Sequence, residues 1–240
     1  MKISDKLNDV YSDYYHSEKV LKKRVISARQ TVSHIMDIVP KPHFRSIIDI
    51  GAGEGSVLQS LDESGLADEL YAVEISQSGC DSIRGRNLKS LKSVEMFDGY
   101  SIPAADKTYE LGLAAHVLEH VEYERPFLQE IARVCDYVYV EVPLELTLNI
   151  ERSIRMASPY GHLNFYTPAT LRNMLVTAGL EVLDLRVYAN SLDYETFVSG
   201  KLKGRINNII RTSALKLAPK HAPFLMTYIG GALCRQAKDI

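Results

Sequence analysis

The stretch SIIDIGAGEGS, residues 46–56, decides the fold of this chain. A short apolar run ends in three glycines at alternate positions, and an apolar pattern with helical spacing resumes after it. This order predicts a buried strand, a tight turn and the start of a helix. Glycine has no Cβ, so the turn can adopt positive φ angles and lie close to a bound group, which the first N–H groups of the helix face. We therefore predict a cofactor-binding turn.

The glycine spacing indicates which cofactor the turn binds. A dinucleotide-binding turn has the pattern G-x-G-x-x-G, whereas Gly51, Gly53 and Gly55 form G-x-G-x-G. With Asp49 two residues before the first glycine, the stretch resembles the first motif of class I S-adenosylmethionine-dependent methyltransferases. The resemblance implies that Asp49, Gly51, Ala52, Gly53 and Gly55 bind S-adenosylmethionine. A purely structural turn and a nicotinamide oxidoreductase are the alternatives, and the early third glycine counts against the oxidoreductase.

Length and composition indicate one domain with elaborations. The chain has 240 residues, 46% of them hydrophobic, and a formal net charge of −2, so we expect no DNA partner. Its three cysteines are odd in number and widely spaced, which is typical of reduced thiols in the cytoplasm. The first residues, MKISDK, lack the apolar core of a signal peptide, and the weakly polar run Pro223–Cys234 is too short to span a bilayer. We expect a cytoplasmic protein without a transmembrane segment.

The N-terminal region reads as a helical lid. Apolar positions before Pro40 recur at helical spacing, so we predict a lid over residues 1–42 and a methyltransferase domain over residues 43–240. Class I methyltransferases often fold an N-terminal helix across the cofactor, and the resemblance therefore implies Tyr14 and Tyr15 as cofactor-binding residues. Packing of these tyrosines onto the sheet is the alternative.

Acidic residues follow the next two predicted strands. Glu74 ends an apolar run roughly twenty residues beyond the glycines, where nucleotide-binding α/β folds place a carboxylate on ribose hydroxyls. The resemblance implies that Ile75 lies against the adenine. It also implies that Asp98, beside Gly99, accepts a hydrogen bond from the adenine amino group. A surface glutamate and an ordinary Asp-Gly turn are the alternatives.

The sequence HVLEHV, residues 116–121, follows the fourth apolar strand and strengthens the resemblance. It is similar to the fourth-strand signature of small-molecule class I methyltransferases, which implies that His116 faces the ligand crevice and contacts the cofactor. The same residues match the inverted zincin motif, which we set aside because a strand end interrupts it. We predict no metal. The alternative set is His116, Glu119 and His120, since ubiquinone-pathway O-methyltransferases carry a divalent-metal motif here, and a histidine ligand favours an ion softer than magnesium.

His162 lies in the stretch GHLNFYTP, residues 161–168, directly before a well-marked helix. In the resembling family a histidine before this capped helix often lies near the transferred methyl group. For an oxygen acceptor we therefore predict His162 as the catalytic base, followed by His116 and His120. A packed or solvent-facing histidine is the alternative.

Basic residues mark two predicted insertions. Arg152 and Arg155 follow the fifth strand on the ligand side, and with Tyr160 they are our candidates for binding an anionic substrate. Residues 199–221 carry six basic and no acidic residues among apolar positions. We expect a helix that covers the domain or pairs two subunits in a homodimer, with peripheral membrane contact as the alternative.

The order of the motifs predicts an α/β fold with a seven-stranded, mostly parallel sheet and helices on both faces. The N-terminal helical lid and a helical insertion before the last strand complete it, and we place insertions at about residues 144–160 and 190–222. The implied function is methyl transfer from S-adenosylmethionine to a small molecule, most simply a hydroxyl of a sugar, a glycan precursor or another anionic metabolite. An N-methyltransferase and a non-catalytic cofactor-binding or interaction protein are the alternatives.

Overall fold

The computed structural model describes residues 18–237. Tyr14 and Tyr15, predicted to contact the cofactor, lie outside the described residues. Within this part of the chain, no helix is both long and apolar enough to cross a membrane.

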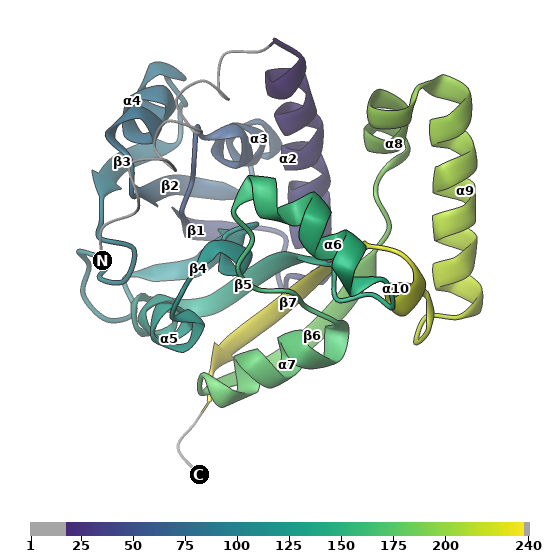
Figure 1. The fold of residues 1–240 in the computed structure, drawn as a ribbon. Helices are drawn as coiled ribbons and strands as arrows, with labels where there is room; N and C mark the ends of the chain where they lie inside the picture. Colours follow the sequence, from purple (N-terminus) through teal and green to yellow (C-terminus); the bar gives the residue numbers. More distant parts are fainter. Residues whose placement is uncertain (1–17, 238–240) are drawn as a thin grey trace.

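Seven strands form one sheet (Figure 1). They are β1 (Phe44–Ile50), β2 (Ala67–Glu74), β3 (Leu91–Met96), β4 (Tyr109–Ala115), β5 (Cys135–Leu144), β6 (Leu180–Tyr188) and β7 (Tyr228–Gln236). Their spatial order is β3-β2-β1-β4-β5-β7-β6, and only β7 runs antiparallel to its neighbours. The predicted seven-stranded, mostly parallel sheet is thus confirmed.

Helices cover both faces of the sheet, because each strand buries apolar side chains on its two sides. The helices are α2 (Glu18–Ile38), α3 (Ser56–Ser64), α4 (Gln77–Gly85), α5 (Glu124–Val134), α6 (Ile150–Ala157), α7 (Pro168–Thr177), α8 (Leu192–Ser199), α9 (Lys201–Leu217) and α10 (Ala222–Leu225). Two short 3₁₀ turns, η1 (Leu118–His120) and η2 (Ser158–Tyr160), follow β4 and α6. Helices α2, α3 and α4 share one apolar cluster with the sheet, while α5 and α7 share the other.

The strand order reverses between β1 and β4. Chain connections leave these two central strands in opposite directions, which opens a crevice at their carboxyl ends, where open α/β sheets bind ligands. The two ends lie close together, since a Cβ built on Gly51 after β1 would stand 2.9 Å from Cγ2 of Val117 after β4. The fold therefore directs attention to the residues that follow β1, β2, β4 and β5.

The region before the last strand is helical, as the sequence predicts. Helices α8 and α9 form an antiparallel pair at the edge of the molecule, with α8 between α2 and α9 (Figure 1). The last strand begins only at Tyr228, because Pro223 occupies the first turn of α10.

Candidate active site

The glycine turn after β1 has the predicted backbone conformation. Gly51, Gly53 and Gly55 have φ angles of 73°, 56° and 84°, in the left-handed region that side chains other than glycine's rarely adopt. A Cβ built on Gly53 meets no atom within 4 Å. Gly53 therefore borders open space on the side where a ligand can approach the backbone.

Asp49 lies buried beneath this turn. Its side chain is 3% exposed, and its Oδ2 atom has no hydrogen-bond partner among the described residues. Burial, together with the charges of Glu74 and Glu54, raises the pKa of Asp49 to about 7. A buried carboxylate with an unused oxygen beside other acids favours binding of a positively charged group.

Glu74 ends β2 with its carboxylate held in a fixed orientation. Oε2 accepts a 3.0 Å hydrogen bond from the backbone N–H of Gly53, and Oε1 accepts from the N–H and the hydroxyl of Ser76 at 3.0 and 2.8 Å. Each carboxylate oxygen has further lone-pair capacity, so the group can also accept from a diol. Gly79 in α4 permits this placement, because a Cβ there would stand 2.6 Å from Cγ of Glu74. Sequence reasoning missed Gly79, since only the fold reveals this close approach.

Ile75 and the loop after β3 meet beside Glu74. A Cβ on Gly99 would contact Cγ2 of Ile75 at 3.8 Å. Oδ1 of Asp98 accepts from the N–H groups of Tyr100 and Ser101 at 2.8 and 2.7 Å, and these bonds lower the pKa of Asp98. The loop thus has the form of an Asx turn, and both Ile75 and Asp98 are exposed.

His116 is held by two carboxylates at the end of β4. Its φ angle of 57° is unusual for a residue other than glycine and marks local backbone strain. Nε2 lies 3.3 Å from Oε1 of Glu141, and Nδ1 lies 3.5 Å from Oε1 of Glu119. Desolvation opposes protonation, but the bonds to Glu119 and Glu141 outweigh it and raise the pKa of His116 to about 10. At neutral pH His116 is therefore a cation and a hydrogen-bond donor.

Glu141 in β5 connects the sheet to α2, and sequence reasoning missed it. The side chain is 0% exposed and accepts hydrogen bonds from Thr31, His34 and Tyr139 at 2.6, 2.8 and 2.6 Å, besides its contact with His116. Desolvation raises the pKa of Glu141, but the bonds to His116 and His34 prevail and hold it well below the usual range. The sequence does carry a signal for Glu141, because a glutamate inside the apolar run of a buried parallel strand needs polar partners.

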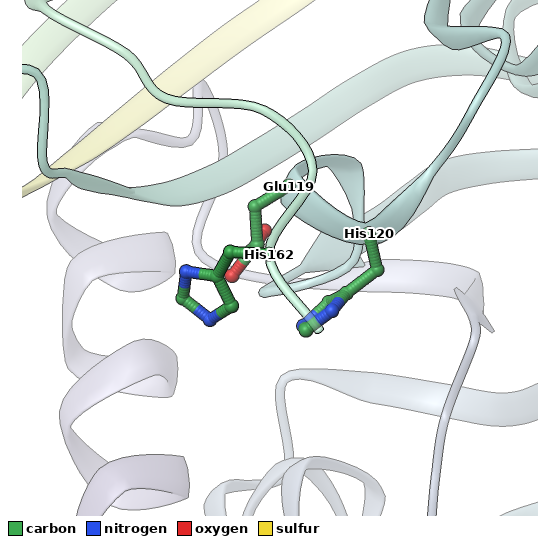
Figure 2. Close-up of side chains that lie close together, drawn as sticks. All are labelled: Glu119, His120 and His162. Carbon is green, nitrogen blue, oxygen red and sulfur yellow. The ribbon is translucent and has the colours of Figure 1, made fainter. Parts of the chain in front are cut away.

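A second cluster brings together Glu119, His120 and His162 (Figure 2). One potential ligand atom from each lies within 4.8 Å of the others, and the two rings meet edge to face with centroids 4.9 Å apart. Nδ1 of His162 lies 2.7 Å from Oε2 of Glu145, and Nδ1 of His120 lies 3.1 Å from the carbonyl oxygen of Gly161. Since both partners only accept, both Nδ1 atoms carry a proton, and in the neutral form of each ring the lone pair is then on Nε2.

Glu119, the third member of this cluster, has one carboxylate oxygen without a hydrogen-bond partner in the described part of the chain. It is buried, and its Oε2 atom has no hydrogen-bond partner among the described residues. The alternative metal set named His116, Glu119 and His120. The structure instead groups His162 with Glu119 and His120, while Nε2 of His116 lies 3.3 Å from Oε1 of Glu141.

The loop that carries His162 is fixed to η1. The N–H groups of Leu163 and Asn164 donate to the carbonyl oxygen of Glu119 at 2.7 and 3.0 Å. The Asn164 amide donates to the carbonyl oxygens of Leu118 and Val121 at 3.1 and 2.7 Å. These four bonds hold the two histidine-bearing segments together.

The predicted substrate residues lie on the insertion after β5. Arg152 and Arg155 are exposed on α6, and Tyr160 is exposed in η2, two residues before His162. Tyr160 is therefore the member of this set nearest to the histidines along the chain, while the arginines border the same loop.

A doubly wound sheet with a glycine turn and an oriented carboxylate beside its switch point is typical of nucleotide-type cofactor-binding α/β proteins. A family model described as a methyltransferase domain matches residues 21–185, and the chain belongs to this family. The cofactor that this family and fold indicate is S-adenosylmethionine, as the sequence predicts.

Known proteins resemble this chain at moderate to low identity. YrhH of Bacillus subtilis (strain 168), named as a candidate methyltransferase, is 29% identical over 108 residues, or 44% of this chain and 60% of YrhH. A chain from the complex of the Haloferax volcanii Trm112 methyltransferase activator with a candidate methyltransferase has a TM-score of 0.67 and 15% identity, covering 98% of this chain and 100% of that chain.

A second similar solved structure is the geranyl diphosphate C-methyltransferase of Streptomyces coelicolor A3(2), in complex with Mg²⁺, geranyl-S-thiolodiphosphate and S-adenosyl-L-homocysteine. It has a TM-score of 0.64 and 8% identity, covering 87% of this chain and 76% of that chain. At such identities the solved structures share the fold with this chain, and the acceptor must be argued from the site.

Proposed function

We propose that this chain transfers a methyl group from S-adenosylmethionine to a hydroxyl oxygen of a small anionic molecule. The observation that carries the proposal is the pairing of two features at one sheet edge. A Cβ on Gly53 would meet open space near Asp49, whose Oδ2 has no hydrogen-bond partner among the described residues, and the oriented histidine His162 belongs to the cluster after β4.

The chain's own residues fit the cofactor. The unused Oδ2 of Asp49 suits a cationic group such as the ammonium of the methionine half, and the oriented carboxylate of Glu74 suits the ribose diol. Ile75 offers an apolar surface for the adenine, and Asp98 offers an acceptor beside it. When bound, S-adenosylmethionine supplies a methyl group on a positively charged sulfur.

The protein's main task is then alignment. Holding the acceptor oxygen in line with the methyl group accounts for about 7–11 kcal/mol of barrier reduction in well-oriented systems. His162 adds base catalysis, which contributes roughly 10²–10⁴-fold. Glu145 holds the Nδ1 proton, so Nε2 of His162 faces the acceptor as the proton-accepting atom.

The other two predicted bases take different roles in this proposal. His116 carries a proton at neutral pH, and its two N–H groups face Glu119 and Glu141, so it positions these carboxylates instead of removing a proton. His120 is neutral, because burial and the nearby His162 lower its pKa, and it stands as the second base. Arg152 and Arg155 then bind the negative charge of the acceptor.

A second candidate mechanism uses a divalent cation. Glu119, with an unused buried oxygen, and the free Nε2 atoms of His120 and His162 form a mixed nitrogen and oxygen ligand set. Glu145 and the Gly161 carbonyl orient the rings as outer partners do for metal-binding histidines. Such a set suits a borderline ion such as Zn²⁺, which would polarise the acceptor oxygen.

One experiment tests the proposal. Purified protein, labelled S-adenosylmethionine and a panel of hydroxylated and amine acceptors are incubated, and methylated products are identified by mass spectrometry. We expect transfer to oxygen, with turnover lost in His162→Ala while the affinity for S-adenosylmethionine, measured by calorimetry, is unchanged. Transfer to an amine with full turnover of His162→Ala would instead identify an N-methyltransferase. Cofactor binding with no transfer to any acceptor would favour a non-catalytic protein.

A further inference from the structure

Helix α9 packs against the protein with its polar side. Asn208 donates to the carbonyl oxygen of Asn190 at 2.8 Å, and Nε of Arg211 lies 3.3 Å from Oε1 of the buried Glu195. Gly204 lets α9 approach α8 closely, because a Cβ there would stand 2.5 Å from the carbonyl oxygen of Glu195. The inner face of α9 therefore satisfies polar groups along most of its length, and only Ala214 and Leu215 near its end pack against the apolar core.

The apolar side of α9 faces outward. Leu202, Ile209 and Leu217 are 75%, 64% and 86% exposed. Ile206 and Ile210 are also exposed, and the spacing of these five residues places them on one side of a helix with 3.6 residues per turn. This is the reverse of an ordinary surface helix, and a continuous exposed apolar stripe of this kind marks an interaction surface.

Positive charges flank the apolar stripe. Lys201, Lys203 and Arg205 are exposed at the start of α9, and Lys216 is exposed at its end. No ion pair joins any of these four to a residue in the described part of the chain. The sequence contains no aspartate or glutamate between residues 196 and 237, although the whole chain has a net charge of −2. Positive charge is thus concentrated beside the exposed apolar side chains.

The charges on α9 discriminate between two possible binding partners of its apolar stripe, a second copy of the chain and a lipid surface. Pairing of α9 with a second copy in antiparallel orientation would bring Lys201 and Lys203 of one subunit against Lys216 and Lys220 of the other, which is repulsive. An anionic lipid surface satisfies both features, since its headgroups attract the lysines and its acyl region receives the apolar side chains.

We propose that α9 binds the surface of a membrane that contains anionic lipids, lying in its plane with the apolar stripe inward. Figure 1 shows α9 as the outermost element on its side of the molecule, so a flat surface can reach it without displacing the sheet. Phe224 and Leu225 on the neighbouring α10 are also exposed. The inference does not depend on the proposed methyl transfer.

Vesicle binding of the full chain tests this inference. Sedimentation is measured with vesicles of phosphatidylglycerol and phosphatidylcholine in equal parts, and with phosphatidylcholine alone. We expect binding to the anionic vesicles that weakens with added salt. Ile206→Ser/Ile209→Ser and, separately, Lys201→Gln/Lys203→Gln should each weaken it roughly tenfold or more.

A matched control variant separates binding through α9 from non-specific hydrophobic adsorption to the vesicles. Met36→Ser/Val176→Ser removes exposed apolar side chains from α2 and α7, and it should bind the vesicles like the unchanged chain. Thermal unfolding and calorimetry with S-adenosylmethionine should be unchanged in all three variants, which shows that the fold is intact.

Three outcomes would overturn the inference. The first is no binding to anionic vesicles, and the second is equal loss in the control variant. The third is a dimer in sedimentation equilibrium that Ile206→Ser/Ile209→Ser dissociates while vesicle binding is absent, which would identify a second copy as the occupant.

Discussion

Oε2 of Glu145 accepts a 2.7 Å hydrogen bond from Nδ1 of His162, which fixes the tautomer of the ring. Glu145 directly follows β5, and His162 follows η2, so the two segments that carry them meet only in the folded chain. In the proposed mechanism this pair determines which histidine nitrogen faces the acceptor.

Glu145 acts through His162, and the two can be separated by kinetics. His162→Ala should lower kcat roughly 10²–10⁴-fold, because the base is lost. Glu145→Gln keeps a hydrogen-bond acceptor but removes the negative charge that stabilises the protonated ring, so kcat should fall by less while KM stays constant. The double variant should be no slower than His162→Ala alone. Additive losses would show that Glu145 has a role of its own.

Gly53 and Gly65 provide a matched pair for the cofactor site. Both have left-handed φ angles, 56° and 65°, and a Cβ on either meets no atom within 4 Å. Gly53→Ala and Gly65→Ala should therefore cost similar stability, about 1 kcal/mol, from backbone strain. Only Gly53→Ala should weaken S-adenosylmethionine binding in calorimetry, because its methyl group enters the ligand space. Equal affinities would place the cofactor elsewhere.

Glu141 should contribute strongly to stability. Because its carboxylate is fully buried and accepts several hydrogen bonds, Glu141→Gln should lower the free energy of unfolding by about 3–5 kcal/mol in urea titrations at neutral pH. Asp106→Asn breaks an exposed ion pair with Arg133 and should cost less than about 1 kcal/mol.

The same carboxylate predicts acid sensitivity. The folded-state pKa of Glu141 is lowered, so its contribution is fully present above the ordinary glutamate pKa of about 4.3 and is lost as pH falls below it. The difference in stability between the unchanged chain and Glu141→Gln should shrink over that acidic range. A difference that stays constant would contradict a charged Glu141.

His116 should give the opposite pH dependence. Its folded-state pKa is raised to about 10, so its contribution is full below the ordinary histidine pKa of about 6.5 and is lost as pH rises toward 10. The unchanged chain should lose more stability than His116→Gln between these two values. Chemical denaturation at a series of alkaline pH values measures this, and parallel curves would mean that His116 is neutral in the folded chain.

Zinc binding distinguishes the two mechanisms for the histidine cluster. If Glu119, His120 and His162 bind a cation, the purified chain should take up Zn²⁺ in equilibrium dialysis, and Glu119→Gln and His162→Ala should each weaken uptake at least about tenfold. His43→Gln alters an exposed histidine bonded to Gly65 and serves as the control. No uptake by the unchanged chain would leave the histidines as bases only.

The sequence predicted the parts of the site that are local. The glycine turn and Glu74 were recognisable because each follows an apolar strand directly, and parallel strands bring their carboxyl ends to one edge. His162 was recognisable from the helix start that follows it. The sheet and its helices also follow from local patterns in the sequence, and the structure confirms them. Their observed boundaries differ from the predicted ones by a few residues.

The partners of these residues were not predictable. Glu141 lies 107 residues from His34 and Glu145 lies 17 residues from His162, and no spacing rule connects them. The direction of a side chain also depends on such partners. His116 and His162 are both near Glu119 in the fold, yet His116 also contacts Glu141, whereas His162 joins His120 in the cluster.

Four hydrogen bonds join the 161–164 loop to residues 118–121. They hold the segments that carry His120 and His162 together before any ligand binds. The conformational entropy lost in bringing distant chain segments together is therefore paid during folding, not during each turnover. A loop free to search for its position would add that cost to every catalytic cycle. In the proposed mechanism, the same bonds that stabilise an irregular surface segment would also lower the entropic part of the activation barrier.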